Sequence, residues 1–238
     1  MRKLDKNKAL VVFSGGQDSS IALIWALQRY QAVETIGFDY GQRHAIELGA
    51  RRSIRRGVKL LKGRWADRLG DDRIVFAGGL KDVGETAMTA EHEIETGDHS
   101  LPTTFVPGRN LHFLVLAGAF AYQNDIGVIV AGMCETDYSG YPDCRADTLA
   151  AQIQAIQLGM DCDIQLETPL MNISKAESWR LLEREGGSEA VELVNEESHT
   201  CYRGVRSQRH VWGYGCDDCP ACSLRKKGWA VYAGGVKV

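Results

Sequence analysis

The chain has 238 residues, of which 44% are hydrophobic and 25% charged, a composition typical of a soluble globular protein that buries its own core. Its formal net charge of −3 argues against a nucleic-acid-binding protein, because phosphate contacts usually require a basic face. There is no run of about 18 apolar residues to cross a membrane, and the apolar stretch at residues 9–13 is too short for a signal peptide, so we expect a cytoplasmic protein that binds neither membrane nor nucleic acid.

Short apolar strands alternate with helical segments over the first two thirds of the chain. Strands that alternate with helices need crossover connections, which place parallel strands side by side and helices on both faces of the sheet. The sequence therefore predicts an α/β fold with a Rossmann-like parallel sheet. In chain order, we expect strands at residues 8–13, 34–39, 73–77, 127–131 and 164–167, and helices at residues 19–30, 43–56, 111–123 and 147–158.

A further helix is predicted after the fifth strand. Ser174 and Glu177 have the spacing of a capping box, with the serine as N-cap and the glutamate three residues later. The helix that they begin should run to Glu185, because Gly186 and Gly187 then stop it.

Other segments are interpreted from their composition. Residues 80–108 have little periodicity and are expected to form a long functional loop. Residues 64–72 are expected to form an additional peripheral helix or loop. The basic runs at residues 51–56 and 224–227 are interpreted as solvated helix faces.

A glycine pair separates the first strand from the first helix, in the sequence Ser14-Gly15-Gly16-Gln17-Asp18-Ser19. The glycines allow a sharp turn that points backbone N–H groups into one concavity, and the start of the following helix attracts an anion. Asp18 would hold a magnesium ion or orient the loop. The segment has neither the Walker A pattern nor a dinucleotide-binding pattern, and its alternative interpretation is a plain strand-to-helix turn.

This S-G-G-x-D-S pattern resembles the pyrophosphate loop of the N-type ATP pyrophosphatases, the PP-loop superfamily. The resemblance implies an adenine nucleotide alpha hydrolase-like fold and an enzyme that cleaves ATP between its α and β phosphates. The AMP group is then transferred to a carboxylate or carbonyl oxygen. That transfer turns a poor leaving group into a good one for a nucleophile such as ammonia.

Four of the seven cysteines lie near the end of the chain, with the spacing C-x14-C-x2-C-x2-C. Thiolates two residues apart on a tight turn can face one tetrahedral zinc ion, and a four-cysteine shell leaves no open position, as in structural zinc sites. A redox pair and an iron–sulfur cluster are the alternatives. We expect the remaining Cys134, Cys144 and Cys162 to be reduced thiols in a reducing compartment. The expected zinc ligands are Cys201, Cys216, Cys219 and Cys222.

Five further stretches follow predicted strands, precede the central helix or open the cysteine cluster: Phe38–His44, Thr104–Asn110, Gly132–Arg145, Glu167–Met171 with Lys175, and Thr200–Tyr202. Together with the first loop and the four cysteines, they closely resemble the QueC family of 7-cyano-7-deazaguanine synthases in queuosine biosynthesis. The resemblance extends over about residues 8–229. The loop alone is a weak signal, whereas ordered motifs that end in a four-cysteine cluster are a specific one.

The resemblance implies a carbon–nitrogen ligase that converts 7-carboxy-7-deazaguanine and ammonia into the nitrile. The carboxylate would be adenylated and attacked by ammonia to give an amide, whose oxygen would be adenylated in turn and expelled. The resemblance also implies ATP, Mg²⁺ and Zn²⁺ as cofactors, and a homodimer. Residues 1–197 would form the PP-loop ATP-binding domain, and residues 198–238 a zinc-binding element packed on it.

Several alternatives stay open at this point. A paralogue would use the same adenylation chemistry on another acceptor in a modification or defence system. A PP-loop tRNA thiolase would need a basic RNA-binding face, and a non-catalytic zinc-dependent interaction module would not require Asp18. The spacer between Cys201 and Cys216 is longer than in better-known members of the family, and residues 205–213 are expected to loop out.

The chemistry of the motifs suggests a role for each group of residues. A carboxylate from Glu135 or Asp137 matches the N1–H and exocyclic amine of a guanine-like base, and Tyr138 or Tyr141 would stack on its ring. The proposed catalytic residues, which orient the loop or neutralise charge, are Asp18, Arg109 and Lys175. Substrate binding is assigned to Arg109, Asn110, Glu135, Asp137, Tyr138, Tyr141 and Arg145. Nucleotide binding is assigned to Phe13, Ser14, Gly15, Gly16, Gln17, Asp18, Ser19, Ser20, Phe38, Tyr40, Gln42 and Arg43.

Overall fold

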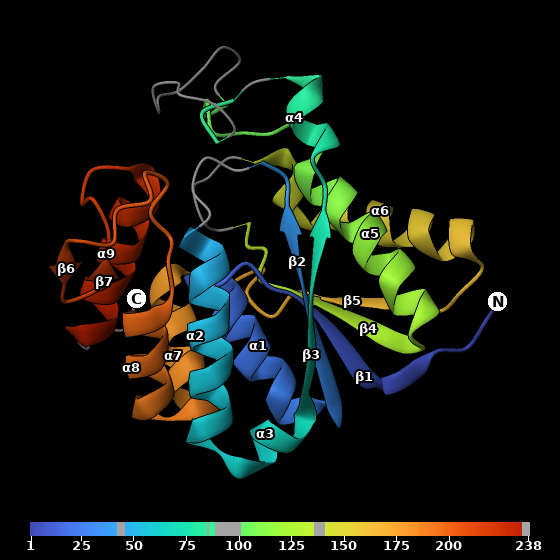
Figure 1. The fold of residues 1–238 in the computed structure, drawn as a ribbon, viewed down its shortest axis with the longest axis horizontal. Coiled ribbons are helices and arrows are strands. Elements are labelled where there is room, and N and C mark those ends of the chain that lie inside the picture. The colour runs from blue at the N-terminus through green and yellow to red at the C-terminus, as the bar shows by residue number, and fades with distance from the viewer. Residues whose placement is uncertain (42–45, 85, 89–100, 136–140, 235–238) are drawn as a thin grey trace.

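The centre of the protein is a five-stranded parallel sheet, shown in Figure 1. The computed structural model describes the chain apart from residues 42–45, 85, 89–100, 136–140 and 235–238. The strand order is β3-β2-β1-β4-β5, so the order reverses between β1 and β4. In open α/β sheets, ligands bind at the carboxyl ends of the strands at such a reversal. The strands are β1 (Asp5–Val12), β2 (Ala32–Asp39), β3 (Leu69–Phe76), β4 (Ile126–Ala131) and β5 (Gln165–Glu167).

Helices cover both faces of the sheet, as the sequence predicts. One face is covered by α1 (Gln17–Arg29), α2 (Ile46–Leu61), α7 (Lys175–Gly186) and α8 (Ser188–Glu197). The other face is covered by α5 (Arg109–Gln123) and α6 (Ala146–Met160). The remaining elements are α3 (Gly63–Arg68), α4 (Gly79–Val83), η2 (Pro142–Cys144), β6 (Arg209–His210), β7 (Gly213–Tyr214) and α9 (Pro220–Ala233).

Side chains of β1 alternate between the two layers of the core. Val11 belongs to the cluster beneath α1, Leu10 belongs to the cluster beneath α5, and both are fully buried. The layer beneath α1 continues outward, because the fully buried Trp179 of α7 meets Trp229 of α9 edge-on, with 5.0 Å between ring centroids. Aromatic pairs in this geometry stabilise a fold beyond their buried area, so α9 is firmly attached to α7.

All five predicted strands and all five predicted helices are present, with shifted ends. The segment at residues 64–72 is helical only at its start, and its last four residues belong to β3. That strand lies at the edge of the sheet and is largely exposed, and the polar residues of its first half conceal where it starts in the sequence. Of the predicted helix at 43–56, residues 43–45 lie outside the described part, and α2 continues to Leu61.

Two longer helices, α8 and α9, were not predicted, and neither was the short α4 at the start of the segment expected to be a loop. Gly187, with a φ of 83°, is both the C-cap of α7 and the N-cap of α8, so the two helices follow each other without a loop. The second unpredicted helix, α9, starts at the cysteine cluster. Within the described residues, no helix is long and apolar enough to cross a membrane.

The start of α7 has the predicted capping box. The Ser174 hydroxyl accepts the backbone N–H of Glu177 at 3.3 Å, and the Glu177 carboxylate accepts the backbone N–H of Ser174 at 2.7 Å. This second bond lowers the pKa of Glu177. The cap fixes the first residue of the helix, which is Lys175.

Replacing Ser174 with alanine should lower the free energy of unfolding by about 1 kcal/mol, because an orphan N–H of the first helical turn loses its acceptor. Ser174→Thr retains the hydroxyl and should stay close to the wild-type value. Urea unfolding at pH 7 measures both variants. A Ser174→Ala variant as stable as wild type would show that the cap contributes nothing.

Candidate functional site

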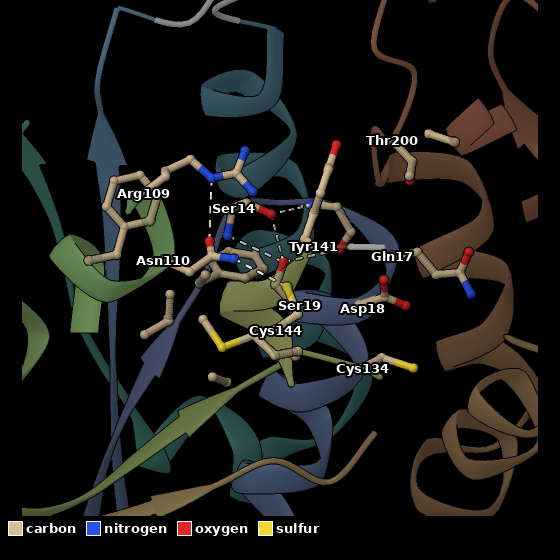
Figure 2. A pocket seen from close by; sticks show the side chains of 18 of the residues that line it. Ser14, Gln17, Asp18, Ser19, Arg109, Asn110, Cys134, Tyr141, Cys144 and Thr200 are labelled. Atoms are coloured by element: carbon tan, nitrogen blue, oxygen red, sulfur yellow. Dashed lines mark hydrogen bonds between the residues drawn. The ribbon is translucent and has the colours of Figure 1, made fainter. Parts of the chain in front are cut away.

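A cavity of about 300 Å³ opens at the carboxyl ends of β1, β2 and β4, where the strand order reverses. Figure 2 shows side chains from its lining. The loop after β1, the starts of α5, α7 and α9, and residues 199–202 all contribute to it. Of the residues predicted for the site, the lining includes Phe13, Ser14, Gly16, Gln17, Asp18, Ser19, Phe38, Tyr40, Arg109, Asn110, Tyr141 and Lys175.

The loop between β1 and α1 is held together by the hydroxyl of Ser19. This oxygen accepts the backbone N–H groups of Ser14 and Gly15, each at 3.2 Å. It is also 3.1 Å from the carbonyl of Gly16, to which it can donate. Gly15 has a φ of 90°, a backbone conformation that favours glycine. The predicted phosphate loop is therefore closed by its own side chains.

Gly132, which directly follows β4, packs against the backbone of this loop. A Cβ at Gly132 would lie 2.8 Å from the carbonyl carbon of Asp18 and 2.9 Å from the nitrogen of Ser19. Only glycine allows two backbones to approach so closely. The loop and the first turn of α1 thus form one fixed wall of the cavity.

Asp18 and Lys175 form an ion pair across the cavity wall. The Lys175 Nζ is 2.8 Å from each carboxylate oxygen of Asp18, and the lysine side chain is only 12% exposed. The pair joins the first turn of α1 to the first residue of α7. The capping box at Ser174 therefore places a cation beside the phosphate loop.

Arg109 lies beside two tyrosine rings elsewhere in the cavity lining, as Figure 2 shows for Tyr141. The guanidinium carbon is 5.9 Å from the ring centroids of both Tyr40 and Tyr141, within the range of cation–π attraction. The Tyr141 hydroxyl shares a hydrogen bond of 2.5 Å with Thr104 Oγ1. Burial disfavours the charge on Arg109, but the two tyrosines and the buried Asp143 outweigh it and raise the pKa of Arg109.

Asn110 is fixed by its neighbours in the PDC turn of η2. Its backbone N–H donates to Asp143 Oδ2 at 3.1 Å, and its side-chain amide lies 3.2 Å from Cys144 Sγ. Burial raises the pKa of the Cys144 thiol to about 12, so the thiol is neutral at physiological pH. Arg109 and Asn110 are thus presented to the cavity by the anchored start of α5.

Two predicted substrate-binding residues lie outside the cavity lining. Glu135 is exposed, and its carboxylate accepts the backbone N–H of Ala146 at 3.1 Å. Arg145 is exposed as the N-cap of α6. Gly15 of the phosphate loop and Ser20 of the first turn of α1 do not line the cavity either. Four further predicted residues, Gln42, Arg43, Asp137 and Tyr138, lie outside the described residues.

The interpretation of the two basic runs as solvated helix faces is wrong for one arginine in each. Arg51 and Arg225 are each 1% exposed, and both line the cavity. Arg51 forms an ion pair with Asp72, and its guanidinium occupies the space where a Cβ on Gly37 would lie. The run of positive charges in the sequence contains no sign of this burial, which depends on a glycine in a neighbouring strand.

The segment at residues 199–202 was also missed as part of the cavity, because its sequence suggests only the approach to the cysteines. The backbone N–H of His199 donates to the carbonyl of Gly15 at 3.1 Å, which ties the segment to the phosphate loop. Burial lowers the pKa of His199 to about 4, so the ring is neutral at physiological pH. The lining residues not predicted for the site include Arg51, Met88, Phe113, His199, Thr200, Tyr202, Leu224 and Arg225.

The four predicted cysteines converge on one point. One sulfur atom from each lies within 4.8 Å of all the others. The sulfurs of Cys216 and Cys222 are 3.9 Å apart, and four sulfurs at 2.3 Å from a tetrahedral zinc would be about 3.8 Å apart. Hydrogen bonds from Cys219 and Cys222 lower the pKa of Cys201, and the same contacts raise the pKa values of Cys219 and Cys222. The cluster is therefore compatible with a tetrahedral thiolate metal site.

Curated relatives of this chain share one description. A protein of Hyphomonas neptunium named 7-cyano-7-deazaguanine synthase is 58% identical over 94% of this chain and 93% of its own length. A protein of Paraburkholderia phytofirmans with the same name is 55% identical over all of this chain and 98% of its own length. A solved structure described as a 4-thiouridine synthetase–RNA complex with bound ATP is 17% identical, with a TM-score of 0.49, over 77% of this chain and 42% of that chain.

A family model agrees with these relatives. The model described as queuosine biosynthesis protein QueC matches residues 8–233, which is nearly the whole chain and includes both the phosphate loop and the four cysteines. The chain therefore belongs to the QueC family.

Proposed function

We propose that this chain is an ATP-dependent carbon–nitrogen ligase that converts 7-carboxy-7-deazaguanine and ammonia into 7-cyano-7-deazaguanine, in queuosine biosynthesis. The observation that carries the proposal is identity above 50%, over almost the full length of both chains, to relatives named for this product. The enclosed phosphate loop in the wall of a cavity of about 300 Å³ supports it.

The reaction replaces both oxygens of a carboxylate by one nitrogen, so each oxygen must become a leaving group. Adenylation of the carboxylate releases pyrophosphate, and attack by ammonia then releases AMP and leaves an amide. Adenylation of the amide oxygen releases a second pyrophosphate, and loss of AMP with two N–H protons gives the nitrile. A single loop that activates an oxygen with ATP serves both steps, so the site needs no nucleophilic side chain.

Three side chains are suited to stabilise these steps. The predicted nucleotide-binding residues that line the cavity contact the ATP at the loop, and Lys175 transfers part of its interaction from Asp18 to the phosphates when ATP binds. Asp18 is then available for a Mg²⁺ ion, which prefers carboxylate oxygens and supplies further neutralisation of phosphate charge when bound. Arg109, with Asn110 beside it, binds the substrate carboxylate.

The deazapurine ring binds between the loop and the wall that contains Tyr141. The Tyr141 ring, which lines the cavity, is proposed to stack on the base. Reading of the guanine-like edge remains assigned to Glu135 or Asp137, with Tyr138 and Arg145 nearby in the sequence. We further propose a cytoplasmic homodimer and a division into an ATP-binding domain at residues 1–197 and a cysteine-bearing element at residues 198–238.

The proposed reaction is tested with purified protein, ATP, Mg²⁺, ammonium and 7-carboxy-7-deazaguanine, followed by mass spectrometry. We expect the nitrile, with two AMP formed for each nitrile. Omission of ammonium should abolish the nitrile, because the amide cannot form. Absence of both nitrile and AMP in the complete mixture would refute the function.

Replacing Lys175 with alanine should lower kcat/KM by about 100-fold or more, since a largely buried cation aimed at developing phosphate charge is lost. The exposed Lys227 provides the matched control, and Lys227→Ala should retain wild-type kinetics. Steady-state AMP release measures both variants, with thermal unfolding to confirm that they are folded. Equal kinetics for the two variants would remove Lys175 from the mechanism.

We also propose that the four cysteines hold one structural zinc ion, because their sulfurs already approach tetrahedral spacing. The expected metal content is about one zinc per chain. Cys219→Ser should lose most of this zinc and unfold at lower temperature, because structural zinc contributes folding free energy. Cys162→Ala changes a buried cysteine outside the cluster and should retain the metal. Iron in place of zinc in the wild-type protein would contradict the proposal.

A further inference from the structure

Arg225 is a buried cation that belongs to the cysteine-bearing element. It lies on α9, three residues after Cys222, and its side chain is 1% exposed. The guanidinium donates to the carbonyls of Trp212 at 2.7 Å and Asn195 at 3.0 Å, and to the hydroxyl of Ser198 at 2.9 Å. A further bond of 3.1 Å reaches the hydroxyl of Thr200. These acceptors are all neutral.

The charge of Arg225 therefore has no carboxylate within ion-pair distance in the described part of the chain. The other cations of the cavity differ in this respect, because Lys175 pairs with Asp18 and Arg51 pairs with Asp72. Taking an uncompensated charge out of water is costly, even when hydrogen bonds satisfy its donors. A buried arginine that faces a cavity without a carboxylate partner is thus suited to an anion that enters the cavity.

The position of Arg225 indicates which part of a ligand it would meet. Its hydrogen bonds to Ser198 and Thr200 hold the segment whose next residue, His199, bonds to Gly15 of the phosphate loop. Burial lowers the pKa of Arg225 to about 10, and the negative charges of Asp18, in the same loop, and of Cys222 offset part of this shift. Arg225 thus belongs to the loop side of the cavity, whereas Arg109 belongs to the wall formed by α5 and the tyrosines.

We propose that Arg225 is the counter-charge for the pyrophosphate group of bound ATP, so that the cysteine-bearing element forms part of the nucleotide site. The inference rests on the proposed ATP-dependent function and adds a specific residue to it. The β and γ phosphates carry most of the negative charge of ATP, and they leave together when the α phosphate is transferred. A fixed positive charge on the loop side favours both their binding and their departure.

The experiment compares two substitutions that remove the hydrogen-bond pattern to a similar extent but differ in charge. Arg225→Gln is neutral, and Arg225→Lys remains a cation. Dissociation constants for ATP and AMP, and inhibition by inorganic pyrophosphate, are measured on the full chain at low and at high salt. Arg206→Met is the matched control, because Arg206 bonds to the carbonyls of Ser198 and Glu196 from the same element but does not line the cavity.

We expect Arg225→Gln to weaken ATP and pyrophosphate about tenfold and AMP by much less, since a unit charge pair roughly 12 Å apart at an effective dielectric constant near 20 has an effect of this order. The loss should shrink at high salt. Arg225→Lys should retain most of the preference for ATP over AMP even if it is less stable, and Arg206→Met should keep the wild-type preference. A purely structural role would weaken all three ligands alike in both Arg225 variants.

An unchanged ATP-to-AMP preference in Arg225→Gln would overturn the inference while leaving the proposed function intact. Failure of the wild-type protein to bind ATP would instead refute the function itself. If Arg225→Gln does not fold, Thr200→Asp and Thr200→Asn take its place. The aspartate would neutralise Arg225 from a position that already accepts its hydrogen bond, and the asparagine has the same shape without the charge. Equal ATP affinity in these two variants would overturn the inference as well.

Discussion

The site depends on the enclosure of a single turn, the loop between β1 and α1. Within the loop, the Ser19 hydroxyl accepts hydrogen bonds from two backbone N–H groups. On its outer side, the absence of a side chain at Gly132 lets the end of β4 pack against the loop. A turn confined in this way presents its polar groups without having to rearrange, and such pre-organised dipoles are a main source of rate enhancement in enzymes. The sheet supplies the confinement, since β4 reaches the loop only because it is the neighbour of β1.

Positive charge reaches the cavity from four separate helices. An enzyme that adenylates a carboxylate must hold two anions close together, and cations on rigid elements counter their repulsion better than cations on loops. Two of these cations, Arg51 and Lys175, form ion pairs with carboxylates, whereas the hydrogen-bond acceptors of Arg225 are neutral. The four cations are Arg51 on α2, Arg109 on α5, Lys175 on α7 and Arg225 on α9.

Features that depend on short-range pattern could be predicted from the sequence, and features that depend on packing could not. The phosphate loop, the capping box at Ser174 and the four converging cysteines each involve residues whose spacing fixes their geometry. The burial of Arg51 depends on a glycine in β2, and that of Arg225 on carbonyls from α8, so neither has a local signal. Similarly, Glu135 follows a strand that ends in the cavity, yet its carboxylate is bonded to the start of α6.

The contact between α9 and α7 has a consequence for Lys175. A Cβ at Gly228 would lie 2.5 Å from the Lys175 Cγ, so α9 lies directly against the aliphatic stem of the lysine. A lysine side chain has about 2 kcal/mol of rotamer entropy to lose when it is immobilised. Because the two helices already restrict this stem, most of that loss occurs when the protein folds rather than when ATP binds. Gly228 therefore helps to position the Lys175 ammonium group, although its helix, α9, contributes no residue to the phosphate loop.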